Sequence, residues 1–220
     1  MPSSKLKLRS RVIRWPAFAA LASMPALLTA QTTQRAAFDT ASLKSLTFRS
    51  IGPANMMGRA TDIEGVPGDP NIVYVGTAAG GVWKTTNGGT TWKPLFEKQS
   101  TLSIGDLALE PGNPEVIYVG TGEGNPRNSV SFGRGVYKST DGGTTWKFLG
   151  LGDTRHIARV IVHPRDPNTV FVCAIGHISG PNTERGVYVS RDGGEHWTRS
   201  LFTDDEHGCA DLDIDPENPN

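Results

Sequence analysis

One short pattern occurs three times in this chain of 220 residues, and this periodicity constrains the fold more than any other feature. Each copy begins with a valine followed by an aromatic residue. It ends with a pair of glycines, two further residues and a tryptophan. The copies occupy residues 82–92, 136–146 and 187–197, roughly 50 residues apart. A second signal, Asp-Pro or Asn-Pro before a run of β-branched residues, precedes each copy. Because a fixed period identifies a repeat architecture, each unit is expected to form the same small substructure.

Each unit contains four short β-type runs separated by turn residues, which is typical of antiparallel strands. In the middle unit these runs are 104–109, 116–120, 135–139 and 145–149. No segment after the N-terminal region has the apolar period and caps of a helix. Four strands that recur about every 50 residues are typical of a propeller blade. We therefore expect an all-β fold, a partial β-propeller of four-stranded antiparallel blades, with blades at 58–97, 103–150 and 156–202.

Three blades are fewer than the roughly four that a closed ring needs. A fourth Asp-Pro signal indicates the start of a further blade at 209–220, with a first strand that buries Leu212 and Ile214. Segment 48–52 occupies the position of a fourth strand that has no blade of its own. We expect this strand to complete the last blade of a longer ring, so the remaining blades of the parent chain are expected partners.

The N-terminal region differs in composition from the repeats. Residues 1–14 carry basic side chains and no acidic one, and a short apolar run ends at Ala30. This order predicts a signal peptide at 1–30, followed by a flexible tether at 31–45. The apolar run is shorter than the roughly 20 residues of a membrane span, so no transmembrane segment is expected after signal removal. The protein is therefore expected to be secreted, periplasmic or at the cell surface.

The polar corners of the repeats have a structural explanation. Asn87, Asp141 and Asp192 are each expected to form an Asx-turn by accepting a hydrogen bond from the backbone two residues on. The following glycines supply positive φ angles without steric cost. The tryptophans Trp92, Trp146 and Trp197 are expected to wedge between neighbouring sheets. These residues are thus predicted to be architectural, and neither a metal site nor a cofactor is expected.

Residues 139–146, Ser-Thr-Asp-Gly-Gly-Thr-Thr-Trp, resemble the Asp-box (BNR repeat) of β-propellers that include sialidases, xyloglucan-specific endoglucanases and the sortilin ectodomain. The other two copies depart from it at Thr85, Asn87 and His196. The sequences of the repeats are most similar to those of exported bacterial sortilin-like proteins, which are often labelled glycosyl hydrolases. The resemblance implies the propeller fold, whereas fold alone does not fix function.

Propeller topology separates two faces of the molecule. The Asp-box turns and the Asp/Asn-Pro turns share one face, while the loops between second and third strands and the connections between blades share the other. Two of these loops, 121–135 and 176–186, carry insertions, and long loops on a rigid scaffold often bind ligands. The candidate ligand-binding residues on this loop face are Asn125, Arg127, Arg155, His156, His177, Asp204, Glu206 and His207.

Three classes of function remain open at this stage. The first is a binding module that recognises a peptide, a protein or a glycan through the loop face. The second is a glycoside hydrolase, which typically needs two carboxyl groups about 5–10 Å apart; Glu123 and Asp153 are its candidates, with further carboxylates on other blades. Against it, the position of the catalytic aspartate in the xyloglucan-cleaving relatives is Ala78 here, and Arg49 matches the sialidase arginine only loosely. The third is a structural scaffold or assembly factor.

The charge balance and the cysteine count restrict the expected partners and cross-links. Lysine plus arginine and aspartate plus glutamate both number 22, so the chain is formally neutral, and no nucleic-acid partner is expected. The two cysteines, Cys173 and Cys209, both fall near the loop face. Export permits a disulfide between them, and the sequence leaves the pairing open.

Overall fold

The computed structural model describes residues 59–125 and 127–219. The predicted signal peptide, the tether, the strand at 48–52 and Arg49 lie outside the described residues. Within the described part, no helix is long and apolar enough to cross a membrane.

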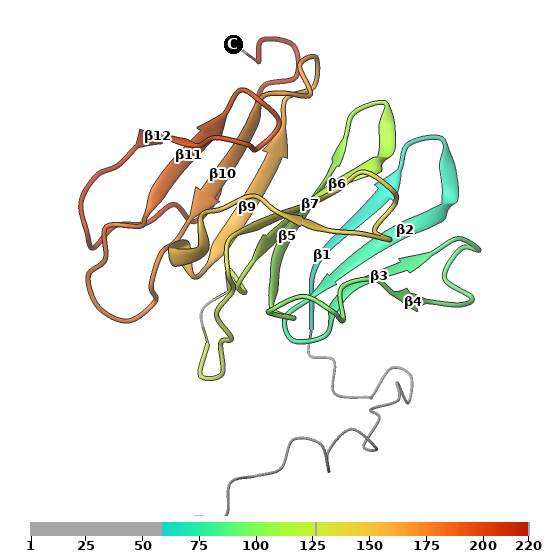
Figure 1. Cartoon of the computed structure of the whole chain (residues 1–220), viewed down its shortest axis with the longest axis horizontal. Coiled ribbons are helices and arrows are strands. Elements are labelled where there is room, and N and C mark those ends of the chain that lie inside the picture. The colour runs from blue at the N-terminus through green and yellow to red at the C-terminus, as the bar shows by residue number, and fades with distance from the viewer. Residues whose placement is uncertain (1–58, 126, 220) are drawn as a thin grey trace, which may run out of the picture. The chain divides into compact units, whose positions relative to one another are not determined.

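The described chain forms three antiparallel four-stranded sheets, each in sequence order (Figure 1). The first sheet contains β1 (Ala60–Val66), β2 (Asp69–Thr77), β3 (Gly81–Thr85) and β4 (Lys93–Pro94). The second contains β5 (Ile104–Glu110), β6 (Asn113–Thr121), β7 (Val136–Ser139) and β8 (Lys147–Phe148). The third contains β9 (Ile157–Val162), β10 (Val170–Ala174), β11 (Gly186–Ser190) and β12 (Thr198–Leu201). One 3₁₀ turn, η1 (Gly152–Thr154), connects the second sheet to the third. The all-β, partial-propeller prediction is confirmed.

The core lies between the blades. One buried cluster joins the first and second sheets around Tyr74 and Ile117, and another joins the second and third around Tyr118 and Val172. The phenol of Tyr118 reaches the next blade and donates a hydrogen bond to the carbonyl oxygen of Gly193 at 3.2 Å. Since each cluster draws residues from two sheets, each blade is stabilised mainly by its neighbour.

Two of the Asp-box tryptophans also contact the preceding blade. Trp146 Nε1 donates to the carbonyl of Leu95 in the preceding blade at 3.0 Å, and Trp197 Nε1 donates to that of Leu149 at 2.8 Å. Trp92 is 40% exposed. The wedge that the sequence predicts is therefore found for the second and third copies of the repeat.

The Asp-box corners differ in one detail from the predicted Asx-turn. Asp141 Oδ1 accepts the backbone N–H of Thr145, four residues on, at 2.8 Å. The amide two residues on, that of Gly143, donates instead to the hydroxyl of Ser139 at 2.8 Å. Asn87 and Asp192 accept backbone bonds from Thr91 and His196 in the same way. The prediction of a bond from the amide two residues on was wrong. That amide donates instead to the hydroxyl of the serine or threonine that lies two residues before the aspartate or asparagine.

The hydrogen bonds at the Asp-box corner also change the pKa of its aspartate. Hydrogen bonds from the hydroxyl and amide of Thr145, and then from Ser139, lower the pKa of Asp141 to about 2.

Backbone hydrogen bonds connect the Asp-box turns to the Asp/Asn-Pro turns. Gly142, next to Asp141, donates its N–H to the carbonyl of Glu115 at 2.9 Å, beside the Asn-Pro turn. Equivalent bonds join Gly88 to Asn71 and Gly193 to Asn168. The Asp-box and Asp/Asn-Pro turns therefore do share one face.

Carboxylates also connect the first strands of successive blades. Asp62 Oδ2 accepts the N–H of Leu107 at 3.1 Å, and Asp106 Oδ2 accepts that of Val160 at 2.7 Å. Burial, followed by the charge of Asp62, raises the pKa of Asp106 to about 7. Arg159 occupies the equivalent position in β9 and lies 3.8 Å from Asp106 Oδ1. This row of side chains therefore links the first strands of the three described sheets.

The segment expected to start a further blade forms no strand in the described part of the chain. Leu212 and Ile214 are half-buried and line a small cavity with Ile161 and Phe171. Leu212 and Ile214 are thus less buried than expected, and the further blade that this segment was expected to start stays a prediction. A strand requires a partner for its backbone groups, and no described segment pairs with this one.

The structure resolves the question of the cysteines. Cys173, at the end of β10, and Cys209 form a disulfide with a Cα–Cα distance of 5.1 Å. The N–H of Cys209 donates to the carbonyl of Ala174 at 2.9 Å, so the backbone is held beside the bridge. The 209–219 segment is thus linked covalently to the third sheet.

Candidate functional site

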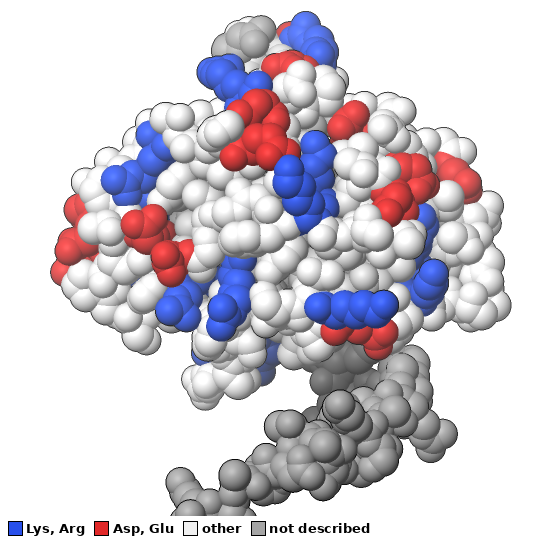
Figure 2. Space-filling model, in the orientation of Figure 1, with Lys and Arg blue, Asp and Glu red and all other residues white. Residues whose placement is uncertain are grey.

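The loop face contains a cleft of about 460 Å³ at the junction of the second and third blades. It is formed by the 121–135 loop, the connection before β9, and the loop after β10. Lys and Arg side chains are visible along the lower edge of the molecule in Figure 2, where Figure 1 shows the 121–135 loop. The side chains that define the cleft are Arg127, Phe132, Arg155, His156, His177 and Ile178.

The base of the 121–135 loop is held by backbone contacts. Gly122 N–H donates to the carbonyl of Ser103 at 2.8 Å, and Gly133 N–H donates to that of Arg155 at 2.7 Å. Gly122 has a φ of 89°, and a Cβ there would collide with the carbonyl of Arg155. Only glycine fits such a close backbone approach at positive φ. The insertion is therefore a fixed wall of the cleft at its base.

Arg155 is the most unusual residue in the cleft. Its φ of 61° and ψ of −46° form a positive-φ conformation that costs a non-glycine residue on the order of 1 kcal/mol or more. Its guanidinium carbon lies 4.9 Å from the centroid of the Phe132 ring, within the range of a cation–π interaction. Its Nε is buried and has no hydrogen-bond partner among the described residues. The Arg155 side chain thus lines the cleft and forms no ion pair with any residue that the structure describes.

Two histidines complete the polar part of the cleft. The buried His156 ring places Nδ1 3.0 Å from the carbonyl oxygen of Glu123. Since a carbonyl only accepts, Nδ1 carries the proton and Nε2 is left as an acceptor in the neutral ring. Burial lowers the pKa of His156 below its ordinary value, so the ring is neutral at pH 7. His177 lines the same cleft from the loop after β10.

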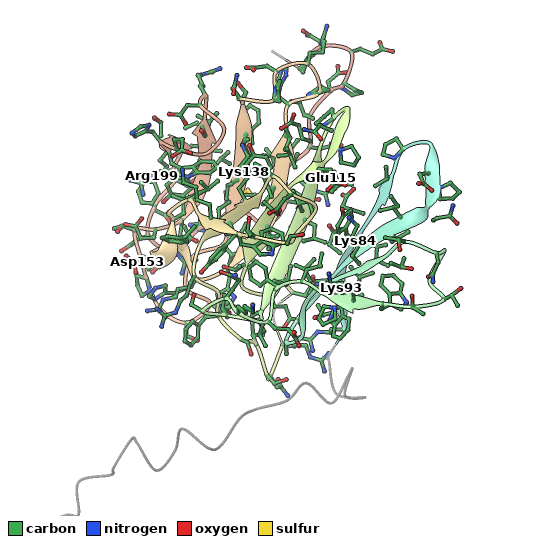
Figure 3. All side chains as sticks on the ribbon, turned by 45° about the vertical axis from the view of Figure 1, so that its right-hand side comes forward. Lys84, Lys93, Glu115, Lys138, Asp153 and Arg199 are labelled. Carbon is green, nitrogen blue, oxygen red and sulfur yellow. A yellow bond between two sulfur atoms is a disulfide. The ribbon has the colours of Figure 1, made fainter. Side chains whose placement is uncertain are left out.

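The two candidate catalytic carboxylates do not line this cleft. The side chain of Glu123 is almost completely buried and forms an ion pair with Arg59. Asp153 is exposed on η1, on the same side of the molecule as Arg199 in Figure 3. No aspartate or glutamate is among the described residues that line the cleft. The geometry thus offers no pair of carboxyls here.

The remaining candidates lie elsewhere on the loop face. Asn125 is exposed and lies outside the cleft. Asp204 accepts hydrogen bonds from the backbone of Glu206 and from the ring of His207 at 2.9 and 2.8 Å. The His207 ring bond, followed by these backbone bonds, lowers the pKa of Asp204. These three residues build a local turn, and His207 lines a separate cavity beside Cys209.

The apolar residues of the cleft were not predicted from the sequence. Phe132 is 52% exposed and Ile178 is 39% exposed, both within the inserted loops. An exposed aromatic residue in an insertion was the available signal, because such side chains are usually buried. The structure brings together Arg127, Arg155, His156 and His177 from the predicted set and adds these apolar neighbours.

Comparison with known proteins agrees with the fold. The family model Sortilin-Vps10, described as "Sortilin, neurotensin receptor 3", matches residues 63–217. No curated protein matches the chain significantly.

Among solved structures, an ancestral GH74 enzyme is similar with 23% identity and a TM-score of 0.55, covering 70% of this chain and 19% of that one. The GH74 xyloglucanase from Xanthomonas campestris has 20% identity and a TM-score of 0.46, covering 64% of this chain and 20% of that one. YCF48 from Cyanidioschyzon merolae has 22% identity and a TM-score of 0.44, covering 66% of this chain and 38% of that one. The chain therefore spans well under half the length of these structures.

Proposed function

The chain belongs to the Sortilin-Vps10 family, and from this premise we propose that it is an exported binding module whose loop face recognises an acidic peptide segment. The observation that carries the proposal is Arg155, which lines the cleft with its guanidinium held over Phe132, has no ion-pair partner among the described residues and has a strained backbone. Backbone strain of this kind persists at sites where the surrounding structure enforces it, and such sites are frequently functional.

The chemistry of the cleft favours a carboxylate ligand. A guanidinium presents parallel N–H donors that match the two oxygens of a carboxylate. Arg127 adds a second positive charge to the lining, and no described lining residue neutralises it. The ligand group that fits is therefore an aspartate or glutamate side chain or a free carboxyl terminus.

The apolar part of the cleft favours a peptide over a glycan. Ile178 and Val130 are aliphatic, and together with Phe132 they offer surfaces for apolar side chains. Glycoside hydrolysis receives less support, because neither Glu123 nor Asp153 lines the cleft. Peptide binding needs no catalytic carboxylate and can use the arginines and apolar side chains that line the cleft.

Selection of random dodecapeptides displayed on phage against the immobilised full chain tests this proposal. Enriched sequences are expected to contain an acidic residue next to apolar ones. For a synthetic enriched peptide, Arg155→Ala is expected to weaken the Kd by about 10- to 100-fold, since a charge-assisted hydrogen bond contributes about 1.5–3 kcal/mol. Fluorescence polarisation gives the Kd.

Arg191→Ala is the matched control, because Arg191 is an exposed arginine in the third Asp-box, on the opposite face. It is expected to leave the Kd unchanged. Enrichment of no sequence, enrichment of sequences without an acid, or equal affinity of Arg155→Ala and the natural chain would contradict the proposal. Binding to acidic glycans on an array, without any peptide binding, would also overturn it.

A further inference from the structure

A second cleft, of about 450 Å³, lies beside the first on the loop face. Ala79 and Leu102 contribute to it from the first blade and the connection that follows, and Arg134 contributes from the end of the inserted loop. Val130 and Phe132 line both clefts. The two clefts are therefore neighbours separated by a shared wall.

The wall between the clefts is anchored from both sides. Thr101 Oγ1 donates to the carbonyl of Phe132 at 3.2 Å, and Ser103 Oγ donates to that of Ser131 at 2.7 Å. On the other side, Gly133 is bonded to Arg155, whose guanidinium lies against the Phe132 ring. A fixed partition of this kind keeps the two clefts distinct when a ligand crosses it.

Exposed apolar side chains continue across both clefts. Leu102 is 38% exposed on the far side of Phe132, and Ile178 lies on the near side. The three side chains come from three different loop segments, so the apolar surface runs across the junctions between blades. The charges of both clefts are positive: Arg127 and Arg155 line the first and Arg134 lines the second, with no described acidic residue in either lining.

We propose that the ligand is an extended peptide that crosses Phe132 and occupies both clefts, with its acidic group at Arg155 and an apolar side chain at Leu102. This inference rests on the proposed function and adds the length and the side-chain pattern of the ligand. An extended peptide directs successive side chains to opposite sides, so separate pockets read alternate residues. Phe132 is then the residue that sets the spacing between the acidic and the apolar position.

The test uses an enriched dodecapeptide and its versions shortened from either end, measured against the natural chain and two variants. Leu102→Ser changes a residue that lines only the second cleft, and Arg155→Ala removes a cation of the first cleft together with its contact to the Phe132 ring. The full peptide is expected to lose about 10-fold in affinity with Leu102→Ser. The shortened version that lacks the apolar end is expected to bind the natural chain and Leu102→Ser equally, while still depending on Arg155.

The outcomes separate the two proposals. Unchanged affinity of every peptide for Leu102→Ser, together with weakened binding to Arg155→Ala, would overturn the two-cleft inference and leave the proposed function standing. Unchanged affinity for Arg155→Ala would overturn the proposed function itself. Leu201→Ser is the matched control, because Leu201 is exposed on β12 and lines neither cleft. Circular dichroism melts of the three variants, which change half-exposed or exposed side chains, verify that each one folds.

Discussion

Tyr118→Ala is expected to lower the free energy of unfolding by about 3–5 kcal/mol, the range for truncating a large buried side chain. Tyr118 is completely buried in the cluster that joins the second and third blades. Its ring lies beneath the ammonium of Lys138 at 4.8 Å, and its hydroxyl reaches the carbonyl of Gly193 in the next Asp-box. Truncation removes the hydrogen bond and the packing to the third blade, together with the contact to Lys138, which lies on the neighbouring strand of the same blade. Urea unfolding followed by tryptophan fluorescence measures the loss.

Tyr118→Phe is the matched control because it keeps the ring and removes only the hydroxyl. The carbonyl of Gly193 still accepts a bond from Lys138 Nζ at 3.3 Å. The expected loss is therefore about 1 kcal/mol, the usual net contribution of one hydrogen bond. Equal stabilities of the alanine and phenylalanine variants would refute the idea that blade-to-blade packing at Tyr118 stabilises the fold.

The disulfide variant Cys173→Ala/Cys209→Ala is expected to lose about 4 kcal/mol of unfolding free energy. The bridge closes a loop with a sequence separation of 36 residues, and the chain-entropy model gives this magnitude for a loop of that size. Such a loss is a large share of the roughly 5–15 kcal/mol typical of folded proteins. Urea unfolding of the oxidised natural chain and of the variant provides the comparison.

The natural chain treated with a reductant is the control for that experiment. Its stability is expected to fall to that of the alanine variant, and the variant is expected not to respond to the reductant. A natural chain equally stable with and without the reductant would show that the link between β10 and the 209–219 segment contributes nothing.

The sequence was sufficient to predict the fold because its signals are local and repeated. Turn residues and β-branched runs determine each strand, and the corner pattern repeats in each of the three sheets. The fourth strand of the second sheet, expected at 145–149, is nevertheless shorter than expected. In β8, the Asp-box turn extends to Thr145, whose amide is bonded to Asp141 and so is not available to a ladder.

The site was less predictable because it depends on contacts between blades. Glu123 was expected on an exposed loop, and the structure buries it against Arg59, which is distant in the sequence. Arg155 and Phe132 meet only because Gly122 and Gly133 bring the inserted loop against the connection before β9. No local pattern encodes that approach. The sequence could identify the face and several of its polar residues, and it could not identify which of them share a cleft.

The central claim is that the Asp-box corners are architectural and that ligands bind on the opposite face. Hydrogen–deuterium exchange of the full chain, with and without an enriched dodecapeptide, tests it most directly. The account predicts slower exchange on peptide binding in segments 127–134, 153–157 and 176–180, with no change in the corners at 87–91, 141–145 and 192–196. Protection of the corners, with unchanged exchange in the loops, would contradict it.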